Sequence, residues 1–126
     1  EVDAFHRSAS EWMAARRKEN LLFISPALLL PEVAGAISRR TGSQDLAERA
    51  VAALQRLPGL RLLEMEPVLI ETAARLAGLL KLRGADAIYV AVAEYLNLPL
   101  CTLDAEQARR AAYKVAIQTI PDFDRG

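Results

Sequence analysis

Short, mostly apolar runs alternate along the chain with longer segments in which apolar residues recur every three or four positions. In one of the longer segments, which opens at Pro67, Leu69, Ala73 and Leu76 fall on one face of a helix. The short runs have the length and bounds of buried strands. Four strands are therefore predicted, at residues 21–24, 60–63, 98–103 and 114–119.

Start and stop signals divide the helical part of the chain. Ser25 is predicted to cap the second helix, because Pro26 behind it suits the first helical position. Gly42 is predicted to end that helix, Ser43 to cap the next one and Asp104 to cap the last. The helices predicted in this way cover residues 3–18, 26–40, 44–57, 67–80, 85–96 and 105–112.

The order of these elements predicts the fold class. Strands that are separated by helices imply right-handed crossovers and a parallel sheet with helices on both faces. We therefore expect an α/β protein with three layers, α/β/α, around a central parallel sheet. The length of 126 residues fits one domain, residues 1–126.

Composition narrows the possible chemistry. Cys101 is the only cysteine and His6 the only histidine, which excludes intrachain disulfides, catalytic triads and cysteine- or histidine-rich zinc sites. A bound metal would need oxygen ligands, which favours Mg²⁺ or Mn²⁺. Sixteen basic and sixteen acidic side chains cancel, so a polyanionic partner would need a local basic patch. No apolar run is long enough for a membrane span, and a reducing cytoplasm is the expected location.

Three acidic residues lie where predicted strands and helices meet. Asp104 directly follows the strand at 98–103, and Asp86 lies in the first turn of a helix. Glu32 lies about two turns into the helix after the first strand, and helical side chains lean back toward the helix N-terminus. Because ligands collect at the carboxyl ends of parallel strands, we expect the three acids at one rim of the sheet.

Such a group of carboxylates would bind a divalent cation. Carboxylates about 5 Å apart repel each other by about 3 kcal/mol per pair at an effective dielectric constant near 20. Mg²⁺ relieves this repulsion, keeps several waters and leaves room for a phosphate. A water on the metal can then hydrolyse a phosphodiester bond. The joint placement of the three acids therefore predicts metal-dependent phosphodiester hydrolysis.

Each acid also has an ordinary structural explanation when it is taken alone. Asp86 is a first-turn acid of the kind that the helix dipole favours. Asp104 is an ordinary N-cap, and Glu32 a solvated residue at a helix edge. Two interpretations of Arg83 remain open: a solvated residue at a helix end, or a contact with RNA phosphates or an antitoxin.

Three segments carry a resemblance to a known family: residues 25–36 (SPALLLPEVAGA), 84–91 (GADAIYVA) and 102–104 (TLD). Together they resemble the PIN-domain family and, within it, the VapC-type ribonuclease toxins of toxin–antitoxin pairs. The resemblance implies an α/β/α fold and an acidic site that binds Mg²⁺ or Mn²⁺ and cleaves RNA. It also implies that Glu32, Asp86 and Asp104 are catalytic metal ligands, and that the partners are an antitoxin and a second copy of the chain.

The chain departs from the family pattern at its start. The family has a first acid at the end of an N-terminal strand, and no such strand precedes Asp3. This favours a truncated or incompletely recorded chain. Two alternatives remain open: a catalytically inactive PIN-like module that binds proteins, and a phospho-accepting receiver domain. The receiver domain fits poorly, because its site needs a pair of acids after the first strand and a lysine late in the chain. Lys114 alone is weak support for that lysine.

Overall fold

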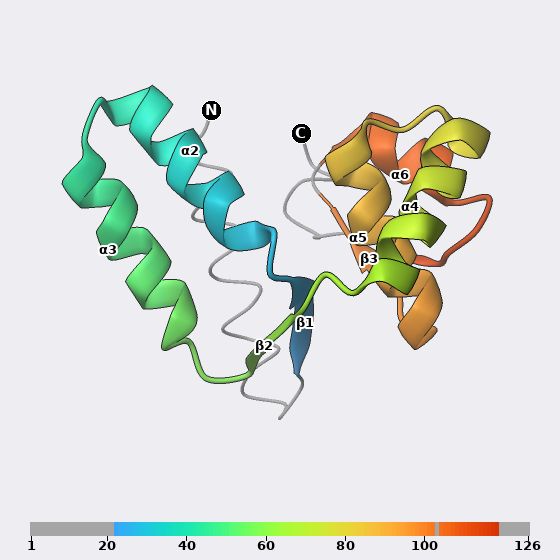
Figure 1. Ribbon diagram of the computed structural model, residues 1–126, viewed down its shortest axis with the longest axis horizontal. Helices are drawn as coiled ribbons and strands as arrows, with labels where there is room; N and C mark the ends of the chain where they lie inside the picture. The colour runs from blue at the N-terminus through green and yellow to red at the C-terminus, as the bar shows by residue number, and fades with distance from the viewer. Residues whose placement is uncertain (1–21, 103, 119–126) are drawn as a thin grey trace.

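The computed structural model describes residues 22–102 and 104–118, and in this part it is an α/β protein. The predicted helix at 3–18 and the tail at 121–126 lie outside the described residues, as does position 103. The elements are β1 (Phe23–Pro26), α2 (Leu29–Thr41), α3 (Gln44–Gln55), β2 (Leu60–Leu63), α4 (Pro67–Leu80), α5 (Gly84–Leu96), β3 (Leu100–Cys101), α6 (Ala105–Ala111) and β4 (Ile117–Gln118) (Figure 1).

The strands pair in parallel, as their order predicts. Strand β1 pairs with β2 in a register that places Phe23 opposite Leu60. Strand β3 pairs with β4, with Leu100 opposite Ile117. In the described part of the chain the strands form these two pairs, and β1 and β2 lie between the α2–α3 hairpin and the helices α4, α5 and α6 (Figure 1). The predicted α/β class with parallel strands is thus confirmed.

The prediction that Ser25 and Pro26 start a helix is wrong. Both residues belong to β1, and helix α2 begins only at Leu29, with Leu28 as its N-cap. The Ser25 hydroxyl donates to the carbonyl oxygen of Pro26 at 3.0 Å instead of capping a helix. Pairing with β2 explains the difference, since the strand pairing continues past Pro26 to the backbone N–H of Ala27, which donates to a β2 carbonyl at 2.8 Å. Proline has no backbone N–H to donate. It is tolerated in a strand where the pairing with the neighbouring strand does not need that donor.

Other helix ends follow the predicted local chemistry. Gly42 ends α2 in the left-handed conformation at φ 70°, which costs glycine little. The Ser43 hydroxyl accepts from the backbone N–H of Leu46 at 3.0 Å and caps α3. Asn97 ends α5 with φ 54°, a conformation that asparagine adopts more readily than most residues. Local side-chain chemistry therefore sets these boundaries.

The buried core is concentrated in the second half of the chain. We call α4, α5, α6, β3 and β4 the C-terminal lobe, and α2 with α3 the N-terminal arm. Small side chains on α5 allow α4 to pack closely against it, and Val90 is among the largest fully buried side chains. In contrast, α2 has no buried residue and α3 has only Ala47. The core cluster consists of Ala73, Leu76, Leu82, Ala87, Val90, Ala91, Ala93, Leu100 and Ala111.

Among the described residues, no helix combines the length and the apolar character that a membrane crossing requires.

Candidate functional site

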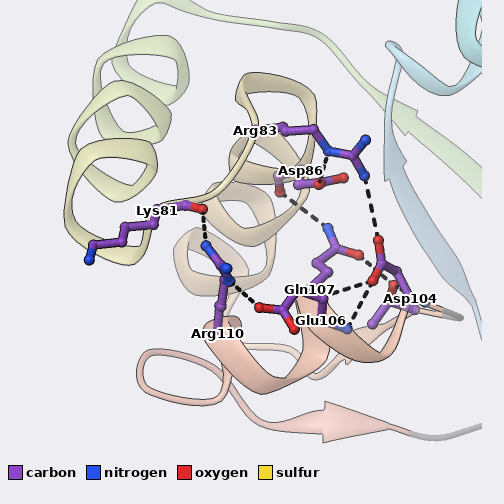
Figure 2. A network of polar contacts seen from close by, with 8 residues as sticks. Lys81, Arg83, Asp86, Asp104, Glu106, Gln107 and Arg110 are labelled. Carbon is purple, nitrogen blue, oxygen red and sulfur yellow. Dashed lines mark hydrogen bonds and ion pairs between the residues drawn. The ribbon is translucent and has the colours of Figure 1, made fainter.

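Two of the three predicted acids meet at one guanidinium group. Arg83 is the N-cap of α5, and its Nε lies 3.3 Å from Oδ2 of Asp86 in the first turn of the same helix. Its Nη2 lies 3.5 Å from Oδ2 of Asp104, which precedes α6 (Figure 2). The two carboxylates are 18 positions apart in the sequence, and the fold directs both at the same positive charge.

The two oxygens of Asp104 have separate partners. Oδ1 accepts from the backbone N–H groups of Glu106 at 2.9 Å and Gln107 at 3.1 Å, so Asp104 is the predicted N-cap of α6. A cap of this kind stabilises a helix by about 1 kcal/mol. Oδ2 faces Arg83. Capping therefore occupies one carboxylate oxygen of Asp104 and leaves the other to pair with Arg83.

A buried glutamine holds the start of α6 against α5. The side-chain nitrogen of Gln107 donates to the backbone carbonyl of Asp86 at 3.4 Å, and its side-chain oxygen contacts the hydroxyl of Thr102. That hydroxyl also accepts from the backbone N–H of Asp104 at 3.1 Å. Sequence reasoning missed Gln107. Its position three residues after the N-cap is typical of a capping box, but here the side chain turns to Asp86 instead.

Glu32 reaches the lobe through a tyrosine. Because α2 starts at Leu29, Glu32 lies in the first turn of that helix, and its Oε1 accepts from the Tyr89 hydroxyl at 2.6 Å. Tyr89 lies three residues after Asp86 on α5. Burial raises the pKa of Tyr89 well above its usual range, and the hydrogen bond to the Glu32 carboxylate and the charge of Asp86 raise it further. The hydrogen bond from the Tyr89 hydroxyl therefore joins Glu32 on α2 to α5, the helix that carries Asp86.

The placement of the acids partly fits a divalent cation. Asp86 and Asp104 supply oxygen donors, which are the ligands that Mg²⁺ and Mn²⁺ take, and they already converge on a cationic group. Glu32 is joined to them through Tyr89 and not directly. Over residues 22–102 and 104–118, no group of three or more acidic, histidine or cysteine side chains is close enough to hold a metal ion. The pair therefore fits the cation, while the three-acid group that the sequence predicts is not assembled there.

Comparison with known proteins identifies the family. The family model for the PIN domain matches residues 2–113, so the chain belongs to the PIN-domain family. PIN domains are typically metal-dependent nucleases that act on nucleic acids. No match was found among curated proteins or among solved structures. The resemblance carried by residues 25–36, 84–91 and 102–104 is thus confirmed for the PIN domain as a whole.

Proposed function

We propose that this protein is a metal-dependent endoribonuclease of the VapC type, which serves as the toxin of a cytoplasmic toxin–antitoxin pair. Its substrate is RNA, its cofactor is Mg²⁺ or Mn²⁺, and its partners are an antitoxin and a second copy of the chain. The observation that supports this proposal best is the convergence of Asp86 and Asp104 on the guanidinium of Arg83. Two acids from different elements meet there at a position that a cation favours.

Glu32, Asp86 and Asp104 have the role of metal ligands in this proposal. When bound there, the ion would supply an activated water and would neutralise charge that develops on the phosphate. The Tyr89 hydroxyl orients Glu32 by donating to one of its oxygens, which leaves the other oxygen for a ligand. Arg83 balances the charge of the two aspartates and, with a side chain that is 82% exposed, is free to turn toward an RNA phosphate.

The decisive experiment removes the charge of one of the two aspartates and keeps the shape of its side chain. In the full-length protein, Asp86→Asn or Asp104→Asn is expected to lower Mg²⁺-dependent RNA cleavage by about 100-fold or more, because a neutral amide neither attracts the ion nor stabilises its charge. Cleavage of a labelled RNA is measured, together with circular dichroism to show that the fold is kept.

Asp45→Asn is the matched control. Asp45 lies in the first turn of α3 and pairs with Arg49 at 2.9 Å, so it is an acid near a helix start that belongs to the N-terminal arm and not to the site. This variant is expected to cleave RNA at the rate of the unchanged protein. Full activity in either site variant would overturn the assignment.

A non-catalytic PIN-like module that binds proteins is the second candidate. The observation that favours it is that residues 22–102 and 104–118 hold no group of three possible ligands. Titration calorimetry with Mn²⁺ separates the two candidates. Binding that Asp86→Asn abolishes supports the nuclease, whereas a full-length protein that neither binds Mn²⁺ nor cleaves RNA supports the module.

A further inference from the structure

A basic hollow lies on the C-terminal lobe, away from the three acids. Its volume is about 610 Å³, and it is formed where the end of α4 faces the end of α6. We call it the α4–α6 hollow. The side chains that line it are Leu79, Leu80, Lys81, Arg109, Arg110, Tyr113 and Lys114.

The charge of the α4–α6 hollow is strongly positive, although the whole chain is neutral. Four of its lining residues are cationic and none is acidic. Glu106 pairs with both Arg109 and Arg110, and these two arginines hold the pKa of its carboxyl below the usual range. In the described part of the chain, no carboxylate lies within ion-pair distance of Lys81 or Lys114. These two lysines are therefore available to an anionic ligand.

Arg110 builds the wall of the hollow. Its Nε pairs with Glu106 at 2.6 Å, and its Nη1 donates to the backbone carbonyl of Lys81 at 2.5 Å (Figure 2). The second contact joins α6 to the left-handed residue that ends α4, since Lys81 has φ 57°. Arg110 thus links the segment that carries Lys81 to α6, the helix that precedes Lys114.

An exposed aromatic ring completes the hollow. Tyr113 is 82% exposed, the highest value among the exposed large apolar and aromatic side chains of the described residues. A solvent-exposed ring between cationic side chains offers a stacking platform for a base next to contacts for phosphates. An acidic protein segment would use the charges but would leave this ring without a matching partner. The combination favours single-stranded RNA.

We infer that the α4–α6 hollow binds single-stranded RNA, with Lys81 and Lys114 on phosphates and one base stacked on Tyr113. The inference rests on the proposed ribonuclease function for the identity of the polymer. The hollow and the candidate site are linked by short stretches of chain: Lys81 lies two residues before Arg83, and α6 runs from Asp104 at its start to Arg110 near its end (Figure 2). In this inference the hollow supplies affinity for the RNA at a distance from the bond that is cut.

Binding is tested without metal, so that cleavage plays no part. Fluorescence anisotropy in EDTA measures the Kd of the full-length protein for a labelled single-stranded RNA of about 12 nucleotides, a length within the range that single-strand sites cover. The double variant Lys81→Asn with Lys114→Ala removes both free charges. Asparagine is chosen at position 81 because it tolerates the left-handed conformation. Tyr113→Ala removes the ring.

The double variant is expected to weaken binding by about tenfold and to lower the slope of log Kd against log salt by about 1.4, or about 0.7 per lost phosphate contact. Tyr113→Ala is expected to weaken binding by about fivefold or more, and Tyr113→Phe to keep the affinity, because the ring and not the hydroxyl stacks. The matched controls are Arg56→Ala and Tyr95→Ala. These change an exposed cation and an exposed tyrosine that do not line the hollow, and they are expected to leave Kd unchanged.

The outcomes separate this inference from the proposed function. Unchanged affinity in the hollow variants overturns the inference and leaves an acidic protein as the occupant. The inference is also overturned if the control variants lose as much RNA affinity as the hollow variants, or if the unchanged protein does not bind RNA. If the hollow variants lose affinity while the unchanged protein fails to cleave the same RNA with Mg²⁺, the hollow is supported and the ribonuclease proposal fails.

Discussion

The N-terminal arm and the C-terminal lobe have similar helices but very different packing. The arm consists of α2 and α3, which contact each other along an amphipathic face yet bury only Ala47. In the lobe, α4 and α5 alone bury eight side chains between them. Helix propensity and capping therefore define the helices of the arm, whereas tertiary packing additionally stabilises those of the lobe.

This difference divides the candidate site. Asp86 and Asp104 lie on the lobe, where Gln107 and Arg83 hold α5 and α6 together. Glu32 lies on the arm, and its hydrogen bond with the Tyr89 hydroxyl joins it to α5, the helix that also carries Asp86. Two of the acids are therefore placed by contacts within the lobe, while the position of the third depends on how the arm sits on the lobe.

The largest expected effect comes from shortening one leucine side chain in each of the two regions. Leu76→Ala is expected to lower the free energy of unfolding by about 2–5 kcal/mol, because Leu76 is 4% exposed in the lobe. Leu46→Ala is expected to cost about 0.5 kcal/mol or less, because Leu46 on the arm is 42% exposed. Urea denaturation of both variants measures the difference. Equal losses would show that the arm is packed as tightly as the lobe.

A smaller effect is expected at the contact between the two regions. Tyr89→Phe removes the hydroxyl that donates to Glu32 and is expected to cost about 1 kcal/mol at neutral pH. The pKa of Tyr89 is raised in the folded protein, chiefly by burial, so the stability that this group contributes is complete below the unfolded value of about 10. It is lost as the pH rises above that value.

Denaturation at about pH 8 and about pH 11, on either side of the pKa of tyrosine in the unfolded chain, measures how stability depends on pH. The unchanged protein is expected to lose more stability over that interval than Tyr89→Phe does. Tyr95→Phe is the control, because Tyr95 is exposed at the end of α5 and should leave the dependence intact. A pH dependence that survives in Tyr89→Phe would contradict the assignment to Tyr89.

The smallest expected effect lies within the lobe. Arg83→Ala is expected to raise the affinity for Mn²⁺ by about two- to threefold, because it removes a competing positive charge from Asp86 and Asp104. The effect is modest because exposed ion pairs are weak. Calorimetric titration measures it, with Arg75→Ala on α4 as the control for loss of one positive charge. A lower Mn²⁺ affinity in Arg83→Ala would show that the arginine organises the pair instead of competing for it.

The sequence by itself determined the features that depend on neighbouring residues. It predicted the strand Leu60–Leu63, the left-handed end of α2 at Gly42, and the caps at Ser43 and Asp104. Each of these rests on contacts within a few positions, where residue type and backbone conformation are directly linked. The motif segments likewise predicted the PIN-domain family and with it the α/β class.

Only the tertiary structure decided which distant side chains meet. Pairing with β2 placed Ser25 and Pro26 in a strand and moved the start of α2, and with it the setting of Glu32. The packing of α6 on α5 turned Gln107 away from its capping position and brought Asp104 to Arg83. Such contacts depend on the orientation of whole elements, which local propensity does not encode. The sequence thus named the acids, and the fold determined that two of them share one cation while the third is joined through a tyrosine.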